Sequence, residues 1–563
     1  MLRKFVPAAA ALFAAACTTV PASRPAQQAS PIEVQILALN DFHGNIETPS
    51  EPTSITQADG TVLKARVGGA AQLAAALERA RTGQRNTVTV AAGDLIGASP
   101  LASAYFLDEP TIDAMNLIGL SVASVGNHEF DKGSAELLRM QNGGCAKNAT
   151  RVPCRLEPFA GGRFQYLAAN VLRADGGTIF PATAIRQVGP IRIGFIGETL
   201  QGTGTIVSPA GVAGLHFADE APTANALVPK LKGAGADAIV LLIHQGGRVP
   251  DSYEEEGCSG LTGDILPILD KLDPAITTVI SGHTHQAYAC TLQRGGAARL
   301  LTSAGKYGFL YTDVRMSFDP TTHHLLGERA INVPVTGASG ADPQVAALVD
   351  RYVTAVKPAA ERVVGHLAAP ALNRLEKGES PVADLIADAQ LAATRSPERG
   401  GADISFINTG GARTDLVPRP DGSVTYAQIF ALEPFGNTLV VRTLTGAQLK
   451  ALLEHQFEVV DGKAQLRSST LVPSASFHFG FDLSRPEGDR IVSMTLDGKP
   501  IDRSGRYRVV VNNFLASGGD GYSALTEGTD TFDAGLDLDA LEAWLATDPA
   551  VPAVGRIHDL TPR

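Results

Sequence analysis

The chain has 563 residues, of which 58 are Asp or Glu and 47 are Lys or Arg, so its formal net charge is −11 at pH 7. This length exceeds one ordinary hydrophobic core, and a prior of ~150 residues per domain predicts two to four domains or subdomains. The negative charge argues against a nucleic-acid partner held through phosphate contacts, which favour a basic face. An anionic substrate would need local positive charge, and bound metal ions are one compact source of it.

The first 17 residues have the pattern of an export signal. Arg3 and Lys4 precede a short apolar run that ends in three alanines and Cys17, and this run is too short to span a bilayer. Small residues directly before a cysteine are typical of a bacterial lipoprotein signal, so we expect a periplasmic or cell-envelope protein lipidated on Cys17. Ordinary cleavage into a soluble exported protein is the alternative. Residues 18–31 have little to bury and are predicted to form a flexible tether.

Four further cysteines, an even number in a chain predicted to be exported, are expected to form disulfides. They permit three pairings. The nearest-neighbour pairing, Cys145 with Cys154 and Cys258 with Cys290, is favoured because each pair falls within one local region. No CxxC spacing indicates a zinc knuckle.

Between residues 32 and 335, short apolar runs alternate with helical patterns, which is typical of a layered α/β domain. Apolar spacing predicts helices over residues 67–81 and 110–120. Buried strands are predicted for the runs ILAL (36–39), VTVAAGD (88–94), SVASVGN (121–127), IRIGFIGE (191–198), AIVLLIH (238–244) and TTVISGH (277–283).

A linker and a connecting helix are predicted over residues 336–362, with the helix interrupted or bent at Pro358. A second, smaller domain is predicted from residue 363 to 563. It has its own Gly-rich turns and strands, including LVVRTLTG (439–446) and YRVVVNN (507–513). The two domains are therefore expected to fold around separate cores.

Polar side chains that can bind a cation follow the predicted strands of the first domain. Asp41 and His43 are two residues apart in NDFHG, so an extended backbone places both on one side of the chain. One such residue per strand is readily explained as a loop polar group, and a lone histidine is more often structural. A succession of strand ends instead predicts a metal site at the carboxyl edge of a sheet, formed by Asp41, His43, Asp94, Asn127, His128, His244, His283 and His285.

The order of these motifs resembles the calcineurin-like metallophosphoesterases, and within them the 5'-nucleotidases that include bacterial UDP-sugar hydrolases. The matching segments are D-x-H, G-D, G-N-H-E, a single H and G-H-x-H. The resemblance implies an α/β/β/α sandwich followed by a smaller α/β 5'-nucleotidase C-terminal domain. It also implies two divalent ions (Zn, Mn, Co or Mg) bridged by Asp94, one held by Asp41, His43 and His285 and the other by Asn127, His244 and His283.

Two cations ~3.5 to 4 Å apart can clamp a phosphoryl group and activate water for attack on phosphorus. The resemblance implies that His128 binds no metal and stabilises the transition state, and that Asp131 orients its ring. The alternative for Asp131 is a helix N-terminal acid favoured by the helix dipole.

Three motifs of the second domain, NTGGAR (408–413), EPFGN (433–437) and NNFLASGGDGY (512–522), resemble the substrate motifs of the same family. By that resemblance Phe435 and Phe514 stack on a nucleobase, although core packing is the alternative for any Phe. Asp520 is expected to accept hydrogen bonds from ribose hydroxyls; a calcium loop is the rival, but one acid does not fill it. The other expected substrate contacts are the phosphate-binding Arg413 and the polar residues Asn408 and Asn437.

The family carries a further phosphate-binding arginine near the start of this domain, where this chain has only the displaced Arg374 and Lys377. The remaining histidines are expected to be surface or core residues. The predicted function is metal-dependent hydrolysis of extracytoplasmic nucleoside 5'-monophosphates. The alternatives are a UDP-sugar hydrolase or 2',3'-cyclic nucleotide phosphodiesterase with the same metals, or a catalytically silent nucleotide-binding lipoprotein.

Overall fold

The computed structural model describes residues 1, 30–49, 52–56, 61–149, 151–208, 211–250, 258–460 and 462–562. The predicted lipidation site Cys17, the rest of the predicted signal after residue 1, and the tether up to residue 29 lie outside these ranges. Within them, no helix combines the length and the apolar composition that a membrane span requires.

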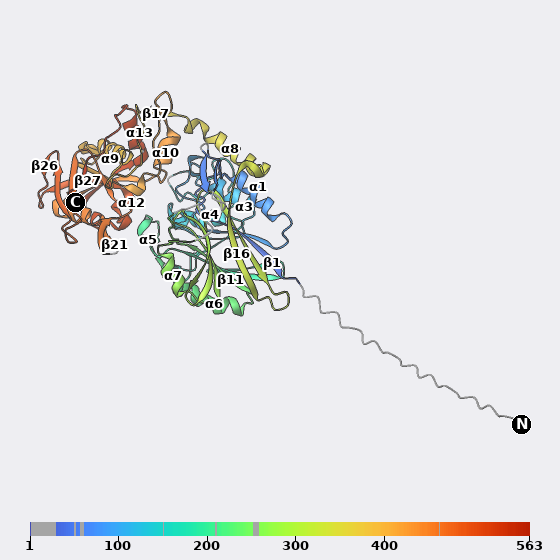
Figure 1. Ribbon diagram of the computed structural model, residues 1–563. Helices are drawn as coiled ribbons and strands as arrows, with labels where there is room; N and C mark the ends of the chain where they lie inside the picture. Colours follow the sequence, from blue (N-terminus) through green and yellow to red (C-terminus); the bar gives the residue numbers. More distant parts are fainter. Residues whose placement is uncertain are drawn as a thin grey trace.

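Two six-stranded sheets form the N-terminal part of the fold (Figure 1). The first has the order β16 (Leu325–Pro334), β15 (Leu310–Phe318), β1 (Ile32–Leu39), β4 (Thr87–Ala92), β5 (Val122–Ser124) and β6 (Gln165–Leu167). The second has the order β13 (Ala287–Arg294), β14 (Ala297–Ala304), β12 (Ile276–Ser281), β11 (Ala238–His244), β9 (Ile191–Thr199) and β8 (Thr183–Val188). The central strands of both sheets are parallel, as the alternation of strands and helices predicts.

The strands bury both faces, and β1 shows how. Val34 and Ile36 face a core shared with Phe195 and Leu242 of the second sheet, whereas Leu37 faces the helices on the opposite side. The helices α1 (Ala70–Arg81) and α3 (Glu109–Ile118) cover the first sheet, and α6 (Glu220–Gly233) and α7 (Ile265–Lys271) cover the second. The expected α/β/β/α sandwich is therefore confirmed.

The carboxyl ends of strands from both sheets meet at one edge of the sandwich. Nδ1 of His244, the last residue of β11, lies 2.8 Å from the carbonyl oxygen of Ala92, the last residue of β4. This contact joins the two sheets just where their parallel strands end. The loops that follow β1, β4, β5, β11 and β12 consequently converge there.

The connecting helix α8 (Pro343–Ala360) packs on α1, α3 and α2 (Leu101–Ala104). Of the two expectations for Pro358, an interruption or a bend, the interruption is wrong, because the helix continues through this residue to Ala360. Pro358 lies in the last turn, so its missing N–H removes only a single hydrogen bond near the end of the helix.

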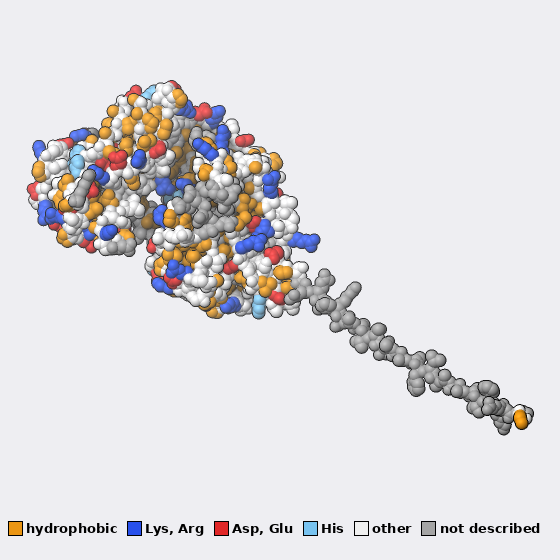
Figure 2. Space-filling model, viewed as in Figure 1, with side chains coloured by type: hydrophobic (Ala, Val, Ile, Leu, Met, Phe, Trp, Pro, Cys, Tyr) orange, Lys and Arg blue, Asp and Glu red, His pale blue; other side chains and the backbone are white. Residues whose placement is uncertain are grey.

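The C-terminal part has a five-stranded sheet in the order β23 (Leu471–Pro473), β18 (Ile404–Asn408), β27 (Arg506–Asn512), β20 (Thr438–Thr445) and β28 (Thr529–Leu536). The helices α9 (Pro381–Thr394), α10 (Tyr426–Leu432), α11 (Gly446–Glu454) and α13 (Asp537–Leu545) surround it, and a four-stranded sheet made by β26 (Lys499–Pro500), β25 (Ile491–Leu496), β24 (Phe477–Phe481) and β29 (Ile557–Asp559) lies beside it. Figure 2 shows two lobes with acidic and basic side chains interspersed on the visible face.

Both predicted disulfides are present. Cys145 is bonded to Cys154 and Cys258 to Cys290, which confirms the nearest-neighbour pairing. The first bond closes a loop of the N-terminal domain between α4 (Ser134–Asn142) and β6. The second joins the segment after β11 to strand β13.

Candidate metal centre and substrate cavity

Asp41, His43 and His285 form the first cluster at the ends of β1 and β12. Nε2 of His285 lies 3.4 Å from Oδ1 of Asp41 and 3.1 Å from Nε2 of His43. The backbone N–H of His283 donates to Oδ2 of Asp41 at 3.0 Å, so Asp41 also fixes the turn that carries His285. Three ligand atoms that face one another in this way can hold one cation.

Asp94, His244 and His283 form the second cluster. Oδ2 of Asp94 lies 2.9 Å from Nε2 of His244 and 3.6 Å from Nε2 of His43, so it faces both clusters. Oδ1 of Asn127 lies 3.0 Å from Nδ1 of His283, which adds an amide oxygen to the second cluster. The seven predicted metal ligands therefore lie together, with Asp94 between the two groups.

Two backbone carbonyl oxygens determine which ring nitrogen of His43 and of His244 faces the clusters. Nδ1 of His43 lies 2.9 Å from the carbonyl of Gly97, and Nδ1 of His244 lies 2.8 Å from that of Ala92. A carbonyl can only accept, so each Nδ1 carries hydrogen and Nε2 is the nitrogen that faces the cluster. A cation that displaces the proton from Nε2 of His244 would find a lone pair there, as it does on the neutral ring of His43. Nε2 of His244 is buried and makes no hydrogen bond despite its close approach to Asp94. This donor set fits divalent cations.

The backbone at these residues is strained. Asp41, His43, Asp94, His283 and His285 all have φ between 47° and 71°, which is uncommon for residues other than glycine. Left-handed backbone at such residues costs energy and is concentrated at functional sites. The strain therefore supports a functional role for the turns after β1, β4 and β12.

Burial and the carboxylates of Asp41 and Asp94 shift the pKa values of the site histidines in different directions. Burial lowers the pKa of His43 to about 3 and that of His283 to about 4, so both rings are neutral. Burial also disfavours the charged form of His244, but the attraction of Asp94 outweighs it and raises the pKa of His244 to about 10. Burial opposes ionisation of Asp94 as well, yet the neighbouring histidines hold the pKa of Asp94 well below its usual value.

Glu129 is a buried site residue that the sequence interpretation missed. Its carboxylate accepts the backbone N–H groups of Asp94 at 2.9 Å, Leu95 at 2.8 Å and Gly126 at 2.6 Å, and it is 2% exposed. A Cβ at Gly126 would lie 2.1 Å from Oδ1 of Asp94. Glu129 thus holds the turn that presents Asp94. Its position within the NHEF motif was the available signal.

His128 is bound differently from the other site histidines. Its Nδ1 lies 2.9 Å from Oδ2 of Asp131, and its backbone N–H donates to Oδ1 of Asp94 at 2.9 Å. Burial disfavours the charged ring, but Asp131 and Asp94 outweigh this effect and raise the pKa of His128. The carboxylate partner on Nδ1 favours the imidazolium form of His128.

A cavity of about 350 Å³ lies between the metal clusters and the C-terminal domain. On one side it is lined by Asn127, His128, Asp131 and His283. On the other side it is lined by all six predicted substrate residues, namely Asn408, Arg413, Phe435, Asn437, Phe514 and Asp520. The fold thus brings residues from the two halves of the chain to one chamber.

Aromatic and cationic side chains meet above His128. The Phe435 ring lies nearly parallel to that of His128, with the ring centroids 6.2 Å apart at 13°. The Arg413 guanidinium lies 5.7 Å from the Phe435 centroid. Among the described residues, Arg413 is the only Lys or Arg that lines the cavity. Arg374 and Lys377 are exposed and do not line it.

Asp520 lies in a left-handed turn with φ 54°. Its Oδ2 accepts Asn408 Nδ2 at 2.8 Å and the hydroxyl of Ser469, a second residue that the sequence interpretation missed. Both bonds are made to Oδ2, which leaves Oδ1 to accept from a ligand. A Cβ at Gly519 would lie 2.5 Å from the Phe514 ring, so glycine is needed for Phe514 to reach its position beside the turn.

Comparison with protein families gives two matches. The family described as calcineurin-like phosphoesterase matches residues 34–287, and the 5'-nucleotidase C-terminal domain matches residues 363–527. The solved 5'-nucleotidase precursor of Thermus thermophilus is 26% identical, with a TM-score of 0.73, over 94% of this chain and 99% of that one.

Two curated relatives are longer than this chain. The endonuclease YhcR of Bacillus subtilis is 30% identical over 512 residues, which are 90% of this chain and 39% of the relative. The cell wall protein Lmo0130 of Listeria monocytogenes is 28% identical over 531 residues, which are 88% of this chain and 64% of the relative. The chain therefore spans less than two thirds of either relative.

Proposed function

Because the chain belongs to the calcineurin-like phosphoesterases that carry a 5'-nucleotidase C-terminal domain, we propose that it hydrolyses nucleoside 5'-monophosphates to nucleoside and phosphate. One observation carries the proposal. The cavity beside the metal clusters is lined by His128 and also by the Arg413, Phe435, Phe514 and Asp520 side chains of the other domain. A phosphate, a base and a ribose thus each find a chemically matched partner.

The metal-site domain supplies the chemistry of phosphate release. Asp41, His43 and His285 would hold one divalent cation, and His244 and His283 a second. Asn127, whose Oδ1 lies beside His283, would complete the second set, and Asp94 would contact both cations. When bound, such cations polarise a phosphoryl oxygen and lower the pKa of water. His128, held by Asp131, donates hydrogen bonds to the phosphoryl oxygens as negative charge develops on them and can protonate the leaving oxygen.

The C-terminal domain recognises the nucleoside. Phe435 and Phe514 offer faces on which a base can stack, and Oδ1 of Asp520 can accept a ribose hydroxyl. Arg413 supplies positive charge for the phosphate near Phe435. Asn408 orients Asp520, and Asn437 lines the same wall of the cavity.

Export and a lipid anchor on Cys17 are part of this proposal. The two disulfides fit an oxidising compartment outside the cytoplasm. A nucleotidase located there would supply the cell with nucleosides and phosphate.

The direct test separates and quantifies the products formed from AMP, UDP-glucose, 2',3'-cyclic AMP and p-nitrophenyl phosphate, with a chelator and after reloading with Zn, Mn, Co or Mg. Inorganic phosphate reports cleavage of the monoesters, whereas a nucleoside monophosphate reports cleavage of UDP-glucose or the cyclic nucleotide. We expect AMP to be hydrolysed with the highest kcat/KM and the chelator to abolish activity. A higher kcat/KM for UDP-glucose or the cyclic nucleotide would favour the diesterase alternatives. Nucleotide binding without hydrolysis of any of these substrates would favour the silent binding protein.

Phe514→Ala is expected to lower kcat/KM for AMP by roughly 5-fold to 150-fold, because stacking of one base contributes about 1 to 3 kcal/mol. Hydrolysis of p-nitrophenyl phosphate, which has no base or ribose, should change far less. Phe532→Ala is the matched control, since Phe532 is a partly exposed residue of the same domain that does not line the cavity. Equal losses on both substrates would mean that Phe514 only supports the fold.

Asp520→Ala is expected to reduce the preference for AMP over 2'-deoxy-AMP, because the variant loses the acceptor for a ribose hydroxyl. The measurement is the ratio of kcat/KM for the two substrates. Asp530→Ala is the control, because Asp530 also has φ 54° but is exposed outside the cavity. An unchanged ratio would contradict the ribose contact.

A further inference from the structure

Helix α10 (Tyr426–Leu432) places Phe435. The helix ends at Leu432, three residues before Phe435, so the position of the helix determines where the Phe435 ring lies relative to His128. The helix belongs to the C-terminal domain but packs against α2 of the first domain and against the connecting helix α8. Phe430, on this helix, is 1% exposed and belongs to a hydrophobic cluster that continues into the first domain.

Arg151 contacts both domains through aromatic rings. Its guanidinium lies 5.0 Å from the centroid of Phe430 and 5.3 Å from that of Tyr105, which directly follows α2. Arg155, four residues later, lies 4.3 Å from the Tyr105 centroid, whereas the guanidinium that lies over Phe430 belongs to Arg151. The two arginines therefore share one aromatic partner, and Arg151 alone of this pair has the partner in the other domain.

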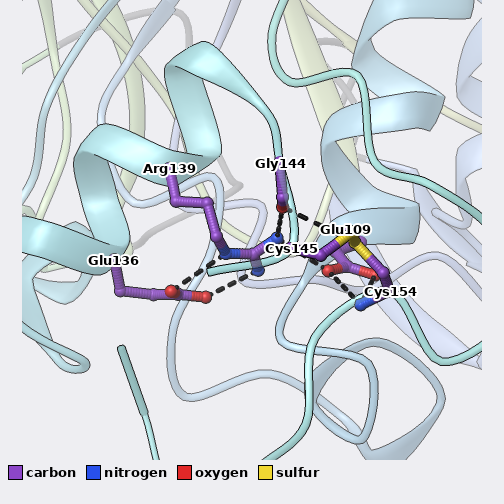
Figure 3. Close-up of a disulfide and its surroundings, with 6 residues drawn as sticks. All are labelled: Glu109, Glu136, Arg139, Gly144, Cys145 and Cys154. Atoms are coloured by element: carbon purple, nitrogen blue, oxygen red, sulfur yellow. Dashed lines mark hydrogen bonds and ion pairs between the residues drawn. A yellow bond between two sulfur atoms is a disulfide. The ribbon is translucent and has the colours of Figure 1, made fainter. Parts of the chain in front are cut away.

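The loop that carries Arg151 is fixed at both ends (Figure 3). It is closed by the Cys145–Cys154 disulfide. On one side, Arg139 of α4 (Ser134–Asn142) donates to the carbonyl of Gly144 at 2.9 Å, and on the other, Glu109 of α3 accepts the N–H of Cys154 at 2.9 Å.

Arg139 and Glu109 are themselves joined at 2.8 Å, and both are buried. Glu136 completes this buried cluster with an ion pair of 2.7 Å to Arg139. The base of the loop is thus held rigidly to two helices of the first domain, while Arg151 reaches the second domain.

We propose that the loop closed by Cys145 and Cys154 is a clamp between the two domains, with Arg151 as its contact residue. Arg151 is a positioning residue: it holds α10 and thereby keeps Phe435 over His128, in the arrangement that completes the cavity. The inference rests on the proposed nucleotidase function, because only a substrate that uses the second domain depends on this arrangement. A substrate without a base can meet the second domain only through the phosphate contact of Arg413, so it depends less on this arrangement.

The kinetic test compares Arg151→Ala with Arg155→Ala, a control that loses the same charge and the same contact with Tyr105. Arg151→Ala should lower kcat/KM for AMP by roughly 2-fold to 30-fold, the range that corresponds to one cation–π contact. Its kcat/KM for p-nitrophenyl phosphate should fall clearly less than that for AMP, and Arg155→Ala should change neither substrate. Equal losses in the two variants, or an equal loss of Arg151→Ala on both substrates, would overturn the clamp.

Two further variants test the parts of the clamp. Cys145→Ala/Cys154→Ala, which frees the loop, should show the same selective loss on AMP, and normal AMP turnover would overturn the role of the disulfide. Phe430→Leu keeps an apolar side chain but removes the ring. Combining it with Arg151→Ala should add no further loss, because both changes remove one contact. Fully additive losses would mean that the two residues act independently.

A distance measurement separates the clamp from the proposed function. Spin labels on Glu78→Cys and Lys499→Cys, exposed positions of the two domains, report the spacing of the domains without any substrate. Arg151→Ala should broaden the distribution of distances, whereas Arg155→Ala should not. If the wild-type protein hydrolyses no AMP, the nucleotidase proposal fails, but the distances still decide the clamp; an unchanged distribution in Arg151→Ala would overturn it.

Discussion

Asp94→Asn is expected to lower kcat by at least roughly 10²-fold, which is at least as large a loss as replacement of His128 should cause. The variant should also bind less divalent metal. Oδ1 of Asp94 accepts the backbone N–H of His128 at 2.9 Å. An asparagine at this position can accept the N–H of His128 only through its amide oxygen. Its Nδ2 nitrogen then takes the place of Oδ2, the atom that faces His244 and His43. An amide nitrogen has no lone pair for a cation, so both clusters lose a ligand and a negative charge.

Metal analysis of the purified protein, together with kcat on AMP, measures this effect. Asp108→Asn is the matched control. Asp108 is a buried aspartate of the same domain with a left-handed backbone, but its carboxylate pairs with Lys132 at 2.8 Å outside the clusters. This control should keep its metal. Near-normal turnover with full metal content in Asp94→Asn would contradict the bridging role.

The layered fold could be predicted because each buried strand is a short apolar run. Residues 238–244, for example, are all buried in β11, and the run stops at the polar residue that enters the site. The same logic brought together the predicted metal ligands, because the ends of strands and the polar residues that follow them are local properties of the sequence. Pro358 misled the prediction because the cost of a proline depends on how close it is to the end of the helix.

Other parts of the site could not be predicted because they depend on contacts between distant segments. Glu129 stands within the NHEF motif, but its role depends on backbone N–H groups of the turn after β4, and the motif does not reveal those partners. Ser469 matters only because the fold places it beside Asp520. The packing of Arg151 on Phe430 likewise joins residues of different domains. Motif spacing identifies side chains that bear chemistry, whereas the groups that orient them emerge only from the three-dimensional structure.

His128→Asn is expected to lower kcat on AMP by roughly 10²-fold or more while the metal content stays unchanged. The ring is attached through Nδ1 to Asp131 and lines the cavity. Its raised pKa favours the protonated form, which can donate to a phosphoryl oxygen but cannot bind a cation. Asparagine cannot supply this charged donor. The backbone N–H of residue 128 can still donate to Asp94 in the variant, so the turn that presents Asp94 should keep its shape.

The metal content decides between two roles, because His128 also lies close enough to His43 and Asp94 to form a third candidate cation group. Loss of an ion in His128→Asn would make it a ligand and contradict the assignment. Asp131→Asn should lower kcat less, since an amide oxygen still accepts from Nδ1 but no longer favours the charged ring. His366→Asn is the control: Nδ1 of His366 also lies near an aspartate, Asp548 at 3.2 Å, but on the exposed surface outside the cavity. Only a histidine that meets the phosphate should combine a large loss of kcat with intact metal sites.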